Sequence, residues 1–116
     1  MTNNNRSRGN KWELVCIQDL KPIYPQAVSS RAESRNRDAQ KVDICYTEPF
    51  NFQCKTTKGK INYDEIIKSM PDDGINIILH KQTEKKGKRF YEVGRYAILP
   101  MEELMMLIDV YKQSKT

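Results

Sequence analysis

The sequence is poor in the residues that build metal clusters and covalent crosslinks. His80 is the only histidine, and the three cysteines, Cys16, Cys45 and Cys54, form no C-x-x-C pair. Their odd number and apolar neighbours predict buried, reduced thiols, and nothing near His80 has the spacing of a zinc site. No apolar run approaches the roughly 20 residues needed to cross a bilayer, so we expect no membrane partner.

The first ten residues are polar and lack the apolar segment that signal peptides carry. We therefore expect a cytoplasmic protein, either of a bacterial or archaeal cell or encoded by a phage and acting in the host cytoplasm. With 116 residues, the chain has room for one domain with a modest core. We predict a flexible basic tail over residues 1–8 and a single domain over residues 9–116.

What the sequence does have is positive charge. There are 20 lysines and arginines against 15 acidic residues, which gives a net charge of +5 and a pI of about 9.1. A small basic domain is compatible with a polyanionic partner, most simply nucleic acid.

Hydrophobic periodicity predicts an α/β protein. Helices are expected over residues 11–20, 63–70 and 101–111, with Asn62 and Glu65 fitting a capping box at the second. Strands are expected over 26–30, 42–46, 50–55, 75–79 and 89–99, the fourth of them central and buried on both sides. Residues 31–41 and 81–88 are predicted to be an exposed loop and a charged hairpin loop. The third helix is expected in the core, with a dimer interface as the second interpretation.

Residues 42–55 carry the most specific pattern. Polar and apolar residues alternate on both sides of Thr47-Glu48-Pro49, which predicts a β-hairpin that turns at Glu48. A symmetric hairpin places Asp43 directly opposite Gln53, about 5 Å apart at Cβ, with Lys55 further along the same face. The reverse face is then apolar and consists of Val42, Ile44, Tyr46, Phe50, Phe52 and Cys54.

A carboxylate, a carboxamide and an ammonium on one strand face suit metal-assisted hydrolysis of a phosphodiester. Mg²⁺ prefers hard oxygen ligands, and Asp43 and Gln53 each supply one. The carbonyl oxygen of Cys54 could add a third, and Glu13, beside the apolar stripe of the first helix, could complete the site directly or through water. Lys55 would orient the attacking water and stabilise the developing charge.

The spacing of Asp43, nine residues, then Gln53-x-Lys55 resembles the D…(D/E)xK motif of the PD-(D/E)xK nucleases. With Glu13 in the segment GNKWE and a short strand before the aspartate, the pattern resembles the archaeal-type Holliday junction resolvases, which phages and other viruses also carry. The resemblance covers about residues 9–80. It implies an α/β fold with a restriction-endonuclease-like core, in which helices flank a central mixed β-sheet. The implied order is α-β-β-β-α-β, plus a C-terminal strand and helix.

The resemblance also implies a metal-dependent DNA endonuclease that uses Mg²⁺, with Mn²⁺ as a substitute, and acts on branched DNA such as four-way junctions. Glu13 would be the helical acid, Asp43 the essential metal ligand, Gln53 the second ligand and Lys55 the catalytic lysine. Gln53 stands where the family more often has Glu or Asp. This removes one negative charge and makes the site more dependent on Glu13. Glu33 competes for the third-acid role.

Several residues are expected to contact DNA. Ser30 and Arg31 would lie near the scissile phosphate. Basic side chains flank the proposed site and could grip phosphates; they are Arg31, Arg35, Arg37 and Lys41 before the aspartate, and Lys58 and Lys60 after the lysine. The basic residues of 81–89 are more simply explained as a solvated hairpin. A four-way junction has two symmetric strands to cut, so a homodimer is expected.

Three other interpretations stay open at the level of sequence. A restriction or repair nuclease of the same fold would share the site, and a non-enzymatic basic protein would bind nucleic acid without cutting it. A protein–protein adaptor would bind DNA weakly and with little salt dependence. The residue pattern also fits a half-exposed hairpin whose polar face is merely solvated.

Overall fold

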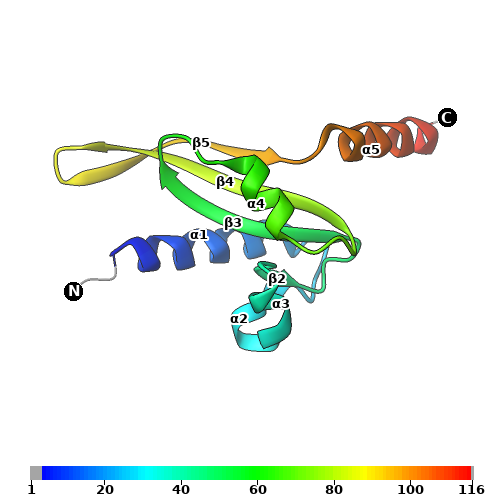
Figure 1. Ribbon diagram of the computed structural model, residues 1–116, viewed down its shortest axis with the longest axis horizontal. Coiled ribbons are helices and arrows are strands. Elements are labelled where there is room, and N and C mark those ends of the chain that lie inside the picture. Colours follow the sequence, from blue (N-terminus) through cyan, green and yellow to red (C-terminus); the bar gives the residue numbers. More distant parts are fainter. Residues whose placement is uncertain (1–3, 116) are drawn as a thin grey trace.

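The computed structural model describes residues 4–115, which contain five helices and five strands (Figure 1). In order they are α1 (Asn4–Leu20), β1 (Val28–Ser29), α2 (Ser30–Glu33), α3 (Arg35–Ala39), β2 (Ile44–Cys45), β3 (Phe50–Lys58), α4 (Tyr63–Ser69), β4 (Ile75–Lys86), β5 (Arg89–Ile98) and α5 (Met101–Ser114). No helix within residues 4–115 is long and apolar enough to cross a membrane.

The main sheet has the strand order β3-β4-β5 and is mixed, as expected. β3 runs parallel to β4, with Gln53 beside Ile78 and Lys55 beside His80. β4 runs antiparallel to β5, with a register shift at Gln82/Thr83 opposite Gly94. β4 is therefore the central strand, as its apolar run predicts, and Ile78 at its middle is fully buried.

Helix α1 covers one face of this sheet (Figure 1). Its buried residues Trp12, Cys16 and Ile17 form a core with apolar residues of the strands, chiefly Phe52, Ile75 and Ile77. The indole Nε1 of Trp12 donates a hydrogen bond of 2.9 Å to the carbonyl of Leu79, which fixes the helix on the central strand. The helix begins at Asn4, so residues 4–8 of the predicted tail are helical, and residues 1–3 lie outside the described part.

Helix α4 lies on the opposite face, against β4 (Figure 1). The N-cap predicted at its start is confirmed, although Glu65 accepts from the Asn62 side chain and not from its backbone N–H as in a capping box. The side-chain oxygen of Asn62 accepts from the Glu65 N–H at 3.2 Å, and the Asn62 amide donates to the Glu65 carboxylate at 3.1 Å. Met70, the residue that ends the helix, is buried.

The predicted hairpin of residues 42–55 is wrong in its strand pairing. β2 pairs antiparallel with β1, with Ile44 opposite Ser29, whereas β3 takes β4 as its ladder partner. The chain leaves the extended conformation directly after β2, because Tyr46 has a φ of 68°. Tyr46 is accordingly exposed and not part of an apolar face, although Val42, Ile44 and Phe52 are buried as predicted.

The exposed loop predicted over residues 31–41 is instead two short helices, α2 and α3. A serine caps each of them: Ser29 Oγ accepts from the Arg31 N–H at 3.3 Å, and Ser34 Oγ accepts from the Arg37 N–H at 3.2 Å. Serine is a preferred N-cap residue because its hydroxyl satisfies a free N–H of the first turn. The two caps explain how so polar a segment becomes helical.

Two elements extend beyond the packed body. β4 and β5 continue past the end of β3, whose last ladder partner is Thr83, and form a two-stranded arm that turns at Gly87 (Figure 1). The loop predicted over residues 81–88 is therefore mostly strand. Helix α5 is present as expected but is not in the core, since none of its residues is buried.

Candidate functional site

Asp43 lies at the open edge of β3, the edge away from β4. Its N–H donates to the carbonyl of Phe52 at 2.8 Å, and its carboxylate Oδ2 accepts from the Cys54 N–H at 2.7 Å. These two bonds flank Gln53. Asp43 thus lies beside the backbone of Gln53, held by one backbone bond and one side-chain bond in place of the expected hairpin ladder.

Gln53 and Lys55 stand two residues apart on β3 and therefore project from the same face of the sheet. Gln53 is 7% exposed, and its Oε1 has no hydrogen-bond partner among the described residues. A buried acceptor without a donor destabilises the fold, because burial removes its hydrogen bonds to water and no hydrogen bond within the protein replaces them. Lys55 is half-buried. The amide oxygen is the atom predicted to bind a metal ion.

Glu13 is buried on α1, where two donors hold its Oε1. Ser29 Oγ donates at 2.6 Å and the Arg31 guanidinium at 3.3 Å. The helix packs on the face of the sheet that carries Phe52 and Cys54, the reverse of the face that carries Gln53. Glu13 therefore approaches Asp43 from one side of β3, whereas Gln53 departs on the other.

Burial raises the pKa of Asp43 to about 6 and outweighs the hydrogen bond from Cys54, which lowers it. The negative charges of Glu13 and Asp38 raise the pKa further, while the ammonium of Lys55 lowers it. The charges of Glu13 and Lys55 are thus both felt at the Asp43 carboxylate. A carboxylate that is expensive to ionise is one that a nearby cation would stabilise strongly.

The donor atoms permit a modest metal site only. Within residues 4–115, no three His, Cys, Asp or Glu side chains gather in a way that could hold a metal ion. Mg²⁺ nevertheless binds through one or two carboxylates while it keeps several waters. Asp43 offers one such carboxylate, and Gln53 Oε1, which has no hydrogen-bond partner among the described residues, offers an uncharged oxygen. The Cys54 thiol does not contribute, since a hydrogen bond with Cys16, together with burial, raises its pKa and keeps it protonated.

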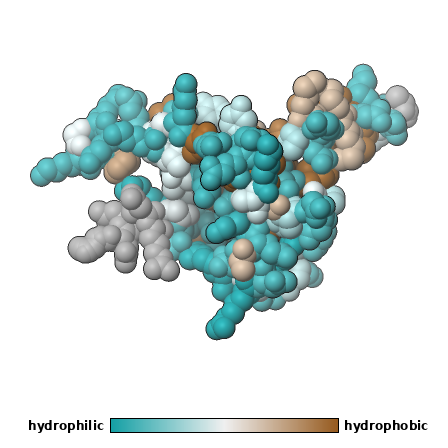
Figure 2. Space-filling view, in the orientation of Figure 1, coloured by the Kyte–Doolittle hydropathy of each residue, from teal (hydrophilic) through white to brown (hydrophobic). Residues whose placement is uncertain are grey.

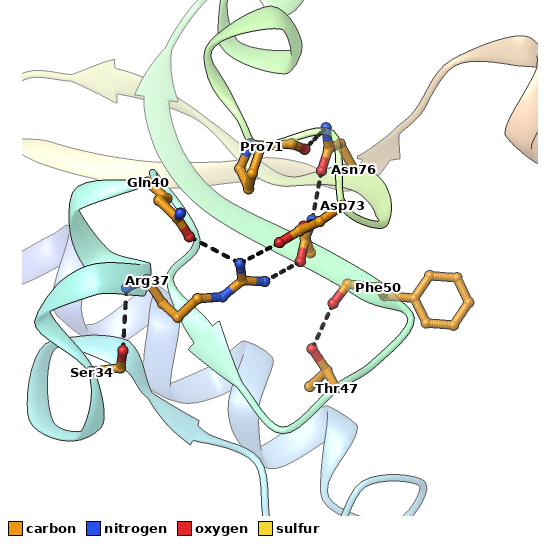
Figure 3. A network of polar contacts seen from close by, with 9 residues as sticks. Ser34, Arg37, Gln40, Thr47, Phe50, Pro71, Asp73 and Asn76 are labelled. Atoms are coloured by element: carbon orange, nitrogen blue, oxygen red, sulfur yellow. Dashed lines mark hydrogen bonds and ion pairs between the residues drawn. The ribbon is translucent and has the colours of Figure 1, made fainter.

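A polar network centred on Arg37 locks α3 to the sheet (Figure 3). The Arg37 guanidinium donates to Gln40 Oε1 at 3.0 Å, to Asp73 Oδ2 at 2.9 Å and to the side-chain oxygen of Asn51. The Asn51 amide in turn donates to Asp73 at 2.9 Å and to Asn76 at 3.0 Å. The network therefore ties α3, the start of β3 and the loop before β4 into one unit, two residues from Gln53.

This network corrects the role predicted for Arg37. Its guanidinium is bound to three internal partners, so it is not directed at a phosphate. Ser30 is corrected as well: it is 0% exposed, and its hydroxyl lies 3.5 Å from Asp38 Oδ1. The other predicted DNA-contacting residues are at least partly accessible at the surface, namely Arg31, Arg35, Lys41, Lys58 and Lys60.

A pocket of about 370 Å³ lies beside the network and includes Glu33, Arg37, Cys45 and Phe50 in its lining. None of Glu13, Asp43, Gln53 and Lys55 lines it. The hydroxyl of Tyr46 donates to Glu33, which places Glu33 on this side of the molecule. Glu33 is therefore no substitute for Glu13 near Asp43.

Two residues near the site, His80 and Asn51, were given no functional role from the sequence. His80 is buried beside Lys55 in the ladder, and its Nε2 lies 2.7 Å from the Thr57 hydroxyl. Burial lowers the pKa of His80, so it is neutral near pH 7. Asn51 shares the alternation of Gln53 and Lys55, and that pattern could have singled it out. Nothing in the sequence pointed to its partner Asp73.

Comparisons of the chain with protein-family models, with curated proteins and with solved structures find no match. The nuclease resemblance therefore stays a prediction that depends on Glu13, Asp43, Gln53 and Lys55 alone.

Proposed function

We propose that the protein is a Mg²⁺-dependent DNA endonuclease that hydrolyses phosphodiester bonds at the edge of β3. The observation that carries the proposal is the pair formed by Asp43 and Gln53. One is a partly buried carboxylate whose pKa is raised, and the other is a buried amide oxygen without a partner. Both features are costs in the absence of a cation and become favourable interactions when a cation binds.

Each residue then has a distinct task. Asp43 and Gln53 would hold the cation, together with the carbonyl of Cys54, and the cation would supply a polarised phosphoryl oxygen and an acidified water. The Lys55 ammonium would donate a hydrogen bond to the phosphate oxygen on which negative charge develops. Glu13, which accepts from Ser29 and Arg31, would keep α1 and the segment before α2 in place around Asp43.

DNA would lie across the basic residues that border this edge. Arg31, Arg35 and Lys41 precede Asp43, Lys58 ends β3, and Lys60 follows it. Within residues 4–115, Arg31 is the one of these five that forms an ion pair. The β4–β5 arm adds Lys85, Lys86, Lys88 and Arg89, all exposed. Such contacts with phosphates release counterions, so binding should weaken steeply as salt rises. The preference for four-way junctions rests on the motif resemblance, and so does the expectation of a homodimer that acts on two symmetric strands.

The test is a cleavage assay on a four-way junction and on a linear duplex of the same sequence, with Mg²⁺, with Mn²⁺ and with EDTA. We expect Asp43→Ala and Lys55→Ala to abolish cleavage while DNA binding in a gel-shift assay changes little. Lys68→Ala is the matched control, because Lys68 lies on α4 and is exposed.

The outcomes separate the competing functions. Cleavage of both substrates at equal rates would favour a restriction or repair nuclease over a junction resolvase. DNA binding with a steep salt dependence but no cleavage with either metal would identify a non-enzymatic binding protein. Weak binding that is insensitive to salt would favour the adaptor.

A further inference from the structure

The two faces of the β4–β5 arm have different surroundings. Phe90 and Arg95 project from the face that is turned toward α1 (Figure 1). Arg8, on α1, places its guanidinium 3.8 Å from the centroid of the Phe90 ring. The Arg95 guanidinium lies 5.4 Å from the ring centroid of Trp12, which is also on α1. These contacts commit one face of the arm to the helix.

The reverse face carries two exposed tyrosines. In the ladder, Tyr91 is opposite Glu84 and Tyr96 is opposite His80. Opposed residues share a face, and so do residues an even number apart on β4, which places both tyrosines on one side. Tyr91 is 47% exposed and Tyr96 is 52% exposed. We call the side that carries them the tyrosine face.

The tyrosine face is continuous with the proposed active site. Lys55 on β3 lies beside His80 on β4, and His80 lies opposite Tyr96 on β5, so the three form a row across the sheet. Neighbouring strands are about 4.8 Å apart, which puts the backbone of Tyr96 about 10 Å from that of Lys55. A DNA strand with a phosphate at Lys55 can therefore bring a nearby base to Tyr96.

Gly94 holds the Tyr96 ring against the strand. A Cβ at Gly94 would lie 2.6 Å from Cζ and 2.8 Å from Cε2 of the Tyr96 ring, so the ring occupies space that a larger residue would fill. About half of the tyrosine side chain stays exposed. The ring is thus positioned along the sheet surface before a ligand binds, which reduces the entropy lost on stacking.

The charge of the arm indicates a polyanion as the partner. Residues 81–95 hold six lysines and arginines against two glutamates, a net charge of +4 in a chain whose net charge is +5. Lys86 and Arg89 are opposed on the tyrosine face, and Lys86 Nζ lies 6.0 Å from the centroid of the Tyr91 ring. Figure 2 shows the arm, at the left of the view, in predominantly hydrophilic colours, which do not suit an apolar partner. Aromatic rings combined with cations bind single-stranded nucleic acid, because the rings stack on bases and the cations contact phosphates.

We propose that the tyrosine face of the arm binds an unpaired DNA strand by stacking its bases on Tyr91 and Tyr96. Lys86 and Arg89 contact the phosphates of the same strand. Stacking on a side chain requires a base released from the duplex, since a paired base is stacked between its neighbours. The relevance of this strand to cleavage at Lys55 rests on the proposed nuclease function, whereas the binding itself does not.

Fluorescence anisotropy in EDTA tests the proposal with two labelled strands of equal length, an oligothymidylate and an abasic oligomer. Both carry the same phosphates, so a difference in affinity comes from the bases. We expect the wild type to bind the oligothymidylate about 10-fold or more tightly than the abasic strand. Tyr91→Ala and Tyr96→Ala should each lower the affinity for oligothymidylate about 10-fold and change that for the abasic strand less than about 2-fold. Tyr91→Phe and Tyr96→Phe, which keep the rings, should bind like the wild type.

Tyr111→Ala is the matched control and should change neither affinity. Tyr111 is 61% exposed on α5 and, like Tyr91, has a lysine over its ring, Lys115. Lys86→Ala should weaken the binding of both strands alike and reduce the salt slope by about 1, whereas the tyrosine variants should keep the slope of the wild type.

The proposal is overturned if the wild type binds the two strands equally well, a comparison that needs no variant. It is also overturned if Tyr91→Ala and Tyr96→Ala weaken both strands to the same degree. Because no metal-dependent cleavage occurs in EDTA, either result leaves the nuclease proposal standing. Base-dependent binding by a protein that never cuts DNA would instead overturn the nuclease proposal alone.

Discussion

The carboxylate of Asp43 accepts a hydrogen bond of 2.7 Å from the backbone N–H of Cys54, on the edge of β3 that faces away from β4. This bond holds Asp43 next to Gln53 and takes up one of its carboxylate oxygens. Burial nonetheless dominates the electrostatics and raises the pKa of Asp43 to about 6. The same residue is thus well positioned and poorly solvated, a combination common at functional sites.

Asp43→Asn should stabilise the metal-free protein at neutral pH. A carboxyl whose pKa is raised from 3.8 to about 6 favours the folded state at low pH, and this advantage is lost as pH rises from about 4 to 6. Above pH 6 the cost amounts to at most about 3 kcal/mol. Urea unfolding at pH 7.5 with EDTA should show the gain, and Asp72→Asn, an exposed change, should show none. A loss of stability in Asp43→Asn would contradict the desolvation argument.

Metal binding should compete with a proton on Asp43. With a pKa of about 6, the carboxylate is largely ionised at pH 7 and largely protonated at pH 5. The affinity for Mn²⁺ should therefore fall about 10-fold between these pH values. Calorimetric titration of the wild type would show this dependence, and Asp43→Asn should bind too weakly to measure. An affinity that does not change with pH would assign the metal to other residues.

Gln53→Leu should stabilise the protein, because it removes a buried oxygen that has no partner. The gain should be about 1–3 kcal/mol in EDTA, and the added stability that Mg²⁺ gives the wild type should disappear. Gln53→Glu should instead increase the effect of low Mg²⁺ concentrations on melting temperature and retain or raise activity. Gln82→Leu serves as the control, because Gln82 is a half-buried glutamine on β4. Complete inactivation by Gln53→Glu would argue against Gln53 as a ligand.

Arg37 and Arg35 should have different roles, Arg37 in the stability of the fold and Arg35 in DNA binding. Arg37→Ala removes the donor shared by Asn51, Asp73 and Gln40, and should cost about 2–4 kcal/mol in unfolding free energy. Arg35→Ala, at an exposed position of the same helix, should leave stability unchanged and weaken DNA binding with a smaller salt slope. Equal stabilities of the two variants would refute the structural role of Arg37.

Gly74→Ala should destabilise the start of β4. A Cβ at this position would lie 2.6 Å from the carbonyl oxygen of Pro49, which also accepts from the Ile75 N–H at 2.9 Å. Backbone must move to relieve the clash, at a cost of about 1–3 kcal/mol. Gly9→Ala is the matched control, since a Cβ there meets nothing within 4 Å and alanine should favour helix α1. Thermal unfolding of both variants measures whether the melting temperature falls in Gly74→Ala and is kept or raised in Gly9→Ala.

Local patterns predicted the elements that depend on neighbouring residues. The Asn62 N-cap, the central strand of residues 75–79 and the strand over residues 89–99 are confirmed. Two-residue alternation also assigned Gln53 and Lys55 to one face of β3. The same reasoning failed over residues 31–41, where serine caps make two short helices, and for α5, whose amphipathic stripe was expected to face the core.

The sequence by itself determined which side chains share a face, because alternation follows from the geometry of a single strand. Only the tertiary structure decided what lies opposite that face, because strand pairing depends on packing between distant segments. β3 pairs with β4 and not with β2, and Arg37 meets Asp73 across 36 residues of chain. The burial of Gln53 and the raised pKa of Asp43 follow from that packing. These two features, which carry the functional proposal, could not be deduced from the motif that first suggested it.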